Sequence, residues 1–465
     1  MKKTSYFLPI KSFNALNPVF CSNFHIFTTQ TKFMGKIAKK PLPVNLNLNV
    51  RGLSQSATLA INEKSQQLIK AGRKVYKFGL GQSPFPVPEP VVEALRQHAH
   101  EKDYLPVCGL LALREAIAEF NKRTQLINSS AEDILIGPGS KELIFILQLV
   151  YYGDILIPTP SWVSYFPQAR IVGRHVQWIA TRAEDGYRLT PEKLDLICRS
   201  DPNRPRVVIL NYPSNPTGCT YPAEKLKQLA QVARKYQIVV VSDEIYGMIH
   251  HQGQHVSMAR FYPEGTIISS GLSKWCGAGG WRLGTFSFPP ELHWLREAMA
   301  TVASETYTST SAPIQYAAIT AFKGGEYIDK YLHDSRRILR FLAKVIRKKL
   351  QAVNIESAAV NGAFYLFPDF SYYREKLKAR NIVTSAELCD ALLNETGVAM
   401  LPGIDFGHQP DDLVARMAYV DFDGRLVLEQ LQAYDDKKLD EDFIRQNCPA
   451  IWGGVNALSE WFEAL

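Results

Sequence analysis

The stretch SGLSKWCGAGGWRLG, residues 270–284, decides the fold, and it places one lysine and one arginine among five glycines and two tryptophans. Lys274 closely follows the apolar run TIISS, where burial of a charged side chain is unfavourable. Two interpretations are open at this point. Either the lysine extends to solvent, or it does not behave as an ordinary charged lysine.

Short apolar runs alternate with helical patterns on the N-terminal side of this stretch. The predicted strands are residues 133–137, 153–158, 204–212, 237–246, 265–271 and 282–288. The predicted helices between them are residues 141–152, 191–199 and 223–237. This alternation predicts an α/β domain with a mostly parallel sheet.

The pattern changes beyond residue 323. A long basic amphipathic helix, residues 328–353, precedes the apolar segments GAFYLFPDF, GVAMLPGIDFG and ARMAYVDF, which are separated by longer pieces. We interpret the basic face of this helix as solvated surface. The wider spacing favours a smaller α+β domain.

We therefore expect three parts along the chain. Residues 1–50 are a basic N-terminal extension, either disordered or targeting. Residues 81–323 form the large domain, and residues 51–80 and 324–465 together form the small domain.

The charge of the chain is concentrated at its N-terminus. The whole excess of basic over acidic residues, 53 against 45, precedes Glu63, the first acidic residue. It consists of Lys2, Lys3, Lys11, Lys32, Lys36, Lys39, Lys40 and Arg51. The remaining chain is balanced, so we expect no nucleic-acid partner.

The N-terminal segment leaves localisation open. An acid-poor, lysine-rich and Ser/Thr-bearing segment resembles an organellar transit peptide, but arginine is absent before Arg51. The alternatives are a disordered tail, or a true start at Met34. We expect a cytoplasmic protein, or an organellar one if residues 1–50 are a transit peptide.

Cysteine usage and hydropathy narrow the class of protein. The seven cysteines include no CxxC pair, which is typical of reduced thiols in an intracellular protein. No apolar run approaches the roughly eighteen residues that span a bilayer. We therefore expect no membrane partner.

The residues just after each predicted strand carry the chemistry, because ligands of open parallel sheets bind at the carboxyl ends of the strands. Gly139, Ser140 and Lys141 follow the first run and precede a helix, whose N-terminus attracts anions. The residues at the ends of the other runs are Trp162, Asn215, Asp243, Tyr246, Lys274 and Arg282.

Together these side chains offer an anion cradle, an aromatic plane, an amide, a carboxylate and an amine. Pyridoxal 5′-phosphate needs an amine for a Schiff base and a carboxylate beside its ring nitrogen. An imine at Lys274 replaces the bare ammonium group, which explains a lysine at a buried strand end. Arg282, eight residues later, suits the phosphate.

Three motifs now point to a family. SGLSKWCGAGGWRLG, NYPSNPTG and SDEIY resemble the lysine, asparagine and aspartate–tyrosine motifs of fold-type-I, class I/II aminotransferases of the aspartate/aromatic/prephenate type. The resemblance runs from about Tyr76 to Gly424. It implies the fold of pyridoxal-phosphate-dependent transferases of type I: a large domain with a mostly parallel seven-stranded sheet, plus a smaller α+β domain.

The resemblance also implies the roles of the residues around the cofactor ring. Lys274 forms the Schiff base and moves a proton as general base and acid. Asp243 pairs with the ring nitrogen. Asn215 and Tyr246 hold the ring oxygen O3′, and Trp162 stacks on the ring face.

Further residues are implied around the phosphate and the substrate. Gly139, Ser140, Lys141, Ser273 and Arg282 surround the phosphate. Tyr104 reaches the phosphate of the partner subunit, which implies a homodimer with shared active sites. Gly81, Trp162 and Asn215 contact the substrate, and Arg416 grips its α-carboxylate.

The chain departs from the family pattern at one position. Many relatives have serine three residues before the lysine as a phosphate ligand, where this chain has Gly271. Ser273 is the better substitute, and Ser270 is the other candidate. Some aspartate- and prephenate-type enzymes share this departure and the WVSY of residues 162–165, which makes an acidic amino donor plausible.

The expected function is transfer of an amino group from an L-amino acid, aspartate-like or aromatic, to a 2-oxo acid such as 2-oxoglutarate, by a ping-pong Schiff-base mechanism. The alternative is a C–S β-lyase or related synthase with the same cofactor. A sensor-type regulator would need a DNA-binding module, for which residues 1–50 are too short and irregular. HHQGQH, residues 250–255, is interpreted as a solvated loop and not as a metal site.

Overall fold

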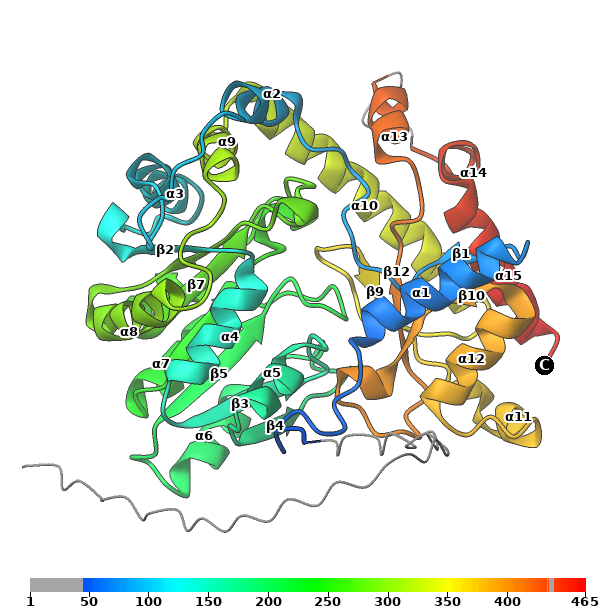
Figure 1. Cartoon of the computed structure of the whole chain (residues 1–465). Helices are drawn as coiled ribbons and strands as arrows, with labels where there is room; N and C mark the ends of the chain where they lie inside the picture. The colour runs from blue at the N-terminus through cyan, green and yellow to red at the C-terminus, as the bar shows by residue number, and fades with distance from the viewer. Residues whose placement is uncertain (1–44, 433, 435–438) are drawn as a thin grey trace, which may run out of the picture. The chain divides into compact units, whose positions relative to one another are not determined.

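A seven-stranded sheet forms the centre of the fold in the computed structural model (Figure 1). Its order is β2-β8-β7-β6-β5-β3-β4, and every neighbouring pair is parallel except the two pairs made by β8. The strands are β2 (Ile134–Gly137), β3 (Asp154–Thr159), β4 (Val176–Ala180), β5 (Arg206–Asn211), β6 (Val239–Asp243), β7 (Thr266–Gly271) and β8 (Gly284–Ser287). The predicted mostly parallel sheet is confirmed, and β4 is a strand that the prediction missed.

Helices cover both faces of this sheet. The helices are α4 (Ser140–Val150), α5 (Tyr165–Ile171) and α8 (His293–Ser304) on one face, and α6 (Pro191–Arg199) and α7 (Ala223–Lys235) on the other. Side chains of a strand alternate between faces, so Val207 and Ile209 of β5 enter the first core and Val208 and Leu210 enter the second. Burial on both faces explains why these strands are continuous apolar runs.

The strand register brings three polar residues to one edge of the sheet. Asn211 at the end of β5 is opposite Asp243 at the end of β6, and Asp243 is opposite Ser269 of β7. Lys274 follows β7 after a short turn. The carboxyl ends of the parallel strands therefore gather the residues that the motifs singled out.

The C-terminal part is built around α10 (Glu326–Ala352) and short strands. Strands β9 (Tyr365–Leu366), β11 (Leu401–Pro402) and β12 (Ala415–Ala418) form an antiparallel sheet in the order β11-β12-β9. Strand β1 (Tyr76–Lys77) pairs with β10 (Val398–Ala399), so a segment from early in the chain lies beside the C-terminal part (blue beside orange in Figure 1).

The remaining helices complete the two ends of the fold. They are α1 (Ala57–Lys70), α2 (Glu89–Gln97), α3 (Leu111–Gln125), α9 (Ala312–Lys323), α11 (Arg374–Ala379), α12 (Ser385–Thr396), α13 (Gly424–Leu431), α14 (Glu441–Asn447) and α15 (Pro449–Glu463). Residues 47–465 form one compact unit. The expected boundaries at 80/81 and 323/324 stay a prediction.

The basic face of α10 is more than the solvated surface that the sequence suggested. Arg336 donates to the backbone oxygen of Met248 at 2.7 Å, and Arg347 donates to that of Ser357 at 3.1 Å. The ammonium group of Lys349 lies 3.9 Å from the ring centroid of Trp452. These cations pack against neighbouring elements, so that interpretation is wrong for part of the helix.

The structure describes residues 45–432, 434 and 439–465, and nearly all of the expected N-terminal extension lies outside them. Within these ranges, no helix is both long enough and apolar enough to cross a membrane. The cysteines among them, Cys108, Cys198, Cys219, Cys276, Cys389 and Cys448, are free thiols.

The start of β8 gives a test of the packing around the α4 N-terminus. A Cβ atom at Gly284 would lie 2.1 Å from the backbone nitrogen of Ser140, so Gly284→Ala forces the backbone apart. We expect a loss of about 1–3 kcal/mol in the free energy of unfolding, measured by denaturant titration. Gly280→Ala is the control, because a Cβ there meets no atom within 4 Å, and an equal loss in both variants would contradict the packing argument.

Candidate active site

One cavity of about 550 Å³ opens at the carboxyl ends of β5, β6 and β7. Its wall also includes residues of β9, β12 and the start of α1. Most of the predicted site residues line it: Gly81, Ser140, Lys141, Trp162, Asn215, Asp243, Tyr246, Ser273, Lys274, Arg282 and Arg416. Segments distant in sequence therefore meet at one site.

Two predicted residues do not line this cavity. Gly139 lies behind Arg282, and a Cβ atom there would be 2.3 Å from Arg282 Nη2. Gly139 also has a φ of +95°, which favours glycine. Tyr104 is 88% exposed, so in this chain its side chain does not reach the cavity.

The Lys274 amine is held inside the cavity. Its Nζ donates to the backbone oxygen of Gly81 at 2.7 Å and lies 5.6 Å from the ring centroid of Tyr246. Burial of the amine, with the positive charges of Arg416 and Arg282, lowers the pKa of Lys274 to about 8. More of this amine is therefore neutral and nucleophilic near neutral pH than is the case for an exposed lysine.

Asp243 is a buried carboxylate at the base of the cavity. Tyr165 donates to its Oδ2 at 2.5 Å and Ser269 donates to its Oδ1 at 3.3 Å. Burial raises the pKa of Asp243 to about 6, despite these donors. A cation beside this carboxylate would offset the burial.

Two tyrosines that the motifs did not assign stand beside the predicted residues. Tyr165 contacts Asp243, and the hydroxyl of Tyr365 lies 2.8 Å from that of Tyr246. A Cβ atom at Gly81 would lie 2.1 Å from the Tyr365 hydroxyl oxygen, so Gly81 leaves the space that this tyrosine occupies. Tyr165 stood in the quoted WVSY segment, whereas no local signal marked Tyr365.

The start of α1 also lines the cavity and was missed. Ser56, Thr58 and Leu59 contribute to the wall, as do Gln82, Ser164 and Asn211. The sequence showed only a helical pattern from Ser56 onward. The approach of this helix to the sheet depends on tertiary packing, which a local pattern does not reveal.

The start of α4 fits an anion. Gly139 is the residue before the helix, and no side chain caps the helix at that position. Lys141 is exposed to the cavity, yet desolvation and then the charge of Arg282 lower its pKa. Free backbone N–H groups at this helix start, and two mutually repelling cations beside it, match anionic ligands such as a phosphate dianion. Ser273 lines this cavity and Ser270 does not.

Arg416 is nearly completely buried, at 1% exposure. Its Nη1 donates to Asn215 Oδ1 at 3.1 Å, and its Nη2 donates to the backbone oxygen of Gly79. Its Nε has no hydrogen-bond partner among the described residues. A buried guanidinium group that faces a cavity, and that forms no ion pair within the described part of the chain, suits a carboxylate ligand.

The HHQGQH segment differs from the prediction of a solvated loop. His250 and His251 are 6% and 5% exposed, and the His255 side chain is 5% exposed. Among the described residues, no group of three or more His, Cys, Asp or Glu side chains could hold a metal ion. The polar composition was misleading for the histidines only: His251 and His255 contact the buried residues Ala363 and Glu244, whereas residues 252–254 are exposed. Cys276, two residues after Lys274, is completely buried, at 0% exposure.

This donor set fits pyridoxal 5′-phosphate. Lys274 offers the amine, Asp243 the carboxylate for the ring nitrogen, and Trp162 an aromatic face. The α4 N-terminus, Ser273 and Arg282 suit the phosphate. The cavity also has room for an amino-acid substrate beside these groups.

The match to known proteins covers most of the chain. The model of the family "Aminotransferase class I and II" matches residues 73–419. The aspartate aminotransferase of Geobacillus stearothermophilus is 34% identical over 81% of this chain and 94% of its own length. The aspartate/prephenate aminotransferase of Thermus thermophilus is 32% identical over 78% and 92%.

A solved structure agrees with these sequence matches. The aspartate aminotransferase from Thermus thermophilus with maleate superimposes with a TM-score of 0.76 at 28% identity, and the match covers 89% of this chain and 100% of that one. The fold, the donor set and both kinds of similarity lead to one assignment. The chain belongs to the class I and II aminotransferase family and is a pyridoxal-phosphate-dependent transaminase.

Proposed function

We propose that the enzyme transfers the amino group of a dicarboxylic L-amino acid such as aspartate to a 2-oxo acid such as 2-oxoglutarate in a ping-pong cycle. The observation that carries this proposal is that two cations, Arg416 and Lys141, line the same cavity. Two separate cations suit the two carboxylates of such a donor. The aspartate-aminotransferase names of the relatives support the same choice, and their transaminase names favour it over a β-lyase.

We assign the α-carboxylate of the substrate to Arg416. Burial of its guanidinium lowers the pKa of Arg416, so an anion at this position offsets an unfavourable burial. Asn215 holds one edge of the guanidinium at 3.1 Å and fixes its plane. A bidentate contact with Arg416 would place the substrate Cα near the Lys274 amine.

We assign the distal carboxylate to Lys141. Its ammonium group lies 5.1 Å from the ring centroid of Trp162, and no acidic group of the described residues pairs with it. The resemblance to the family also made Lys141 a candidate for the phosphate. An aromatic donor would need no second cation, so Lys141 separates the two donor classes.

The proton transfer is assigned to Lys274. When bound, pyridoxal phosphate supplies an electron sink that stabilises negative charge at the substrate Cα. Lys274, with a pKa near 8, is suited to take the Cα proton and to return it to the cofactor carbon. Asp243 would keep the ring nitrogen of the bound cofactor protonated, and Trp162 would pack against the ring face.

We further propose a homodimer with shared active sites, located in the cytoplasm unless residues 1–50 direct it to an organelle. The 88% exposure of Tyr104 supports the dimer, because an exposed aromatic residue in a site motif is available to a partner. Most of this N-terminal segment, residues 1–44, lies outside the described residues.

Lys141→Gln tests the donor class. We expect kcat/KM for L-aspartate to fall about 10- to 100-fold, because a hydrogen bond to a charged group contributes about 1.5–3 kcal/mol. We expect kcat/KM for L-phenylalanine to change little. Lys225→Gln, on the exposed side of α7, is the matched control. Equal losses with both donors, together with weaker cofactor binding, would assign Lys141 to the phosphate.

The lowered pKa of Lys274 predicts how cofactor binding depends on pH. The amine must lose its proton before it attacks the cofactor aldehyde, so the reconstitution rate of apo-enzyme should rise with pH with a midpoint near 8. Stopped-flow absorbance measures this rate. Nα-acetyl-L-lysine, whose ε-amine is free, is the control for an ordinary amine. A midpoint above 10, as for an exposed lysine with a pKa of about 10.4, would rule out the perturbed amine.

Mixing two variants with impaired activity tests the shared site. In a heterodimer of Tyr104→Ala and Lys274→Ala chains, one site receives both wild-type residues if Tyr104 acts across the interface. Random reassociation should then restore about one quarter of wild-type activity, since half of the dimers are mixed and each has one complete site. If Tyr104 acts within its own chain, mixing restores nothing above the residual activity of Tyr104→Ala.

A further inference from the structure

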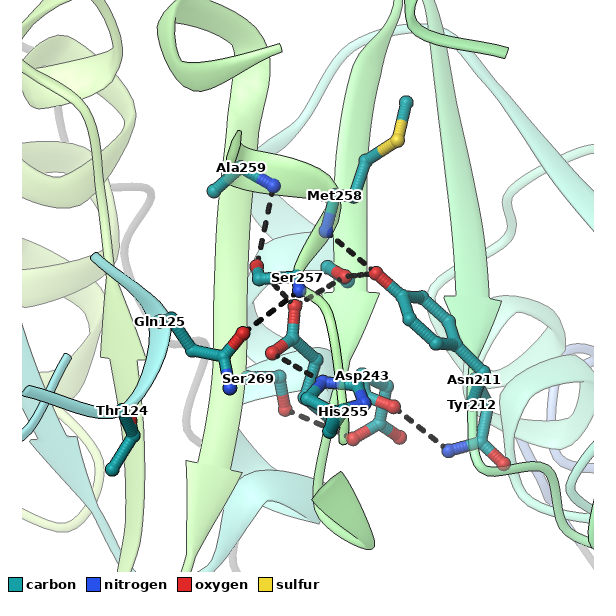
Figure 2. Close-up of polar contacts among 12 residues, drawn as sticks. Thr124, Gln125, Asn211, Tyr212, Asp243, His255, Ser257, Met258, Ala259 and Ser269 are labelled. Atoms are coloured by element: carbon teal, nitrogen blue, oxygen red, sulfur yellow. Dashed lines mark hydrogen bonds and ion pairs between the residues drawn. The ribbon is translucent and has the colours of Figure 1, made fainter. Parts of the chain in front are cut away.

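A group of polar side chains surrounds Glu244, the residue after Asp243, and none of them lines the cavity; Figure 2 shows the contacts among them. We call it the rear network; it consists of Gln125, Tyr212, Ser242, Glu244, His255 and Ser257. Ser242 and Ser257 are completely buried, and Glu244 is 6% exposed.

Glu244 is the centre of the rear network. Ser257 and Ser242 donate to its Oε1 at 2.5 and 2.7 Å, and His255 Nε2 lies 2.8 Å from its Oε2. Three donors on one buried carboxylate satisfy both of its oxygens. Removal of one donor would leave a buried charge partly unsatisfied, which is strongly unfavourable.

A second layer of contacts holds these donors in place. The hydroxyl of Tyr212 lies 2.9 Å from Ser242 Oγ and accepts from the backbone nitrogen of Met258 at 2.7 Å. The backbone nitrogen of Ser257 donates to Gln125 Oε1 at 2.9 Å, as Figure 2 shows. The network therefore joins β6 to α3 and to the segment around residue 257.

The rear network reaches the active site through the turn that follows β6. Asp243 and Glu244 are consecutive, and their side chains point to opposite sides, one into the cavity and one into the network. The backbone nitrogen of Gly247 donates to the backbone oxygen of Glu244 at 2.7 Å. A Cβ atom at Gly247 would lie 2.8 Å from His255 Cδ2, so the His255 ring packs against this turn. The turn that carries Asp243 and Tyr246 is therefore in contact with both Glu244 and His255.

The network also places a second carboxylate next to Asp243. The charge of Glu244 raises the pKa of Asp243, as a smaller contribution than burial. Several ionisable groups of the neighbouring elements face these two carboxylates. Tyr165, Tyr246 and Lys274 face Asp243. Tyr212 and His255 face Glu244, and His250 lies beyond His255. Of these, His255 is the group in direct contact with Glu244 that can offset its negative charge.

We propose that Glu244 and His255 form a positioning pair: their contact fixes the turn that carries Asp243 and Tyr246, and it offsets the second carboxylate so that Asp243 stays ionised for the cofactor ring nitrogen. This inference rests on the assignment of Asp243 to that nitrogen. Neither Glu244 nor His255 lines the cavity, so both act through Asp243.

The test uses His255→Leu, Glu244→Gln and the double variant, each prepared as apo-protein and as holoenzyme. The first readout is the affinity of the apo-protein for pyridoxal phosphate across the pH range around the Asp243 pKa of about 6. The second is the acidic limb of the kcat–pH profile. His293→Leu is the matched control, because His293 lies 2.7 Å from the buried Asp133, outside the cavity wall.

In His255→Leu, the Glu244 carboxylate loses the contact that offsets it, so ionisation of the neighbouring Asp243 becomes less favourable. The pH midpoint of cofactor affinity and the midpoint of the acidic limb of the kcat–pH profile should both move to higher pH by about one unit. KM for the amino donor should stay within about twofold of the wild-type value. The double variant has no second carboxylate, and its midpoints should return to the wild-type position. His293→Leu should leave both midpoints unchanged, even if its melting temperature falls.

Unchanged midpoints in His255→Leu, or a double variant that keeps the shift, would overturn the proposal and leave a purely structural role. If His255→Leu does not fold, Glu244→Gln decides alone: its midpoints should lie at or below those of the wild type, and a shift to higher pH would overturn the proposal. A wild-type holoenzyme without Schiff-base absorbance would instead show that the cofactor assignment itself fails.

Discussion

The active site depends on a carboxylate buried at the end of a central parallel strand. Asp243 is 3% exposed, and the donors from Tyr165 and Ser269 do not prevent burial from raising its pKa to about 6. A buried charge of this kind needs a cationic partner, and the protonated ring nitrogen of pyridoxal phosphate is one. In the same cavity, burial lowers the pKa of Lys274 to about 8, so its amine is suited to react with the cofactor aldehyde.

Asp243 and Lys274 come from the carboxyl ends of the central strands and the segments that follow them. The C-terminal part supplies the side chains that surround these two groups. Tyr365 of β9 pairs with Tyr246, and Arg416 of β12 binds Asn215. The sheet therefore fixes the groups around the cofactor, whereas the antiparallel sheet adds groups suited to the substrate. This division agrees with a scaffold on which one cofactor serves different amino acids.

The sequence predicted the central strands because burial on both faces makes β2, β3, β5, β6 and β7 apolar runs. It missed β4, an edge strand whose Trp178 is 40% exposed. Most predicted site residues of the large sheet line the cavity because they follow β2, β3, β5, β6 or β7 at the same edge. Tyr365 and the start of α1 were missed because tertiary packing brings them to the cavity. The prediction of a solvated loop at residues 250–255 was wrong for the histidines, because polar composition does not reveal buried partners.

The most direct measurement of the central claim, that Lys274 binds the cofactor, is borohydride reduction of the holoenzyme followed by peptide mapping with mass spectrometry. Reduction converts a Schiff base into a stable secondary amine and marks the lysine that formed it. The account predicts one pyridoxyl group for each chain, on the peptide that contains Lys274. A label on another lysine, or no label in a preparation that holds the cofactor, would contradict it.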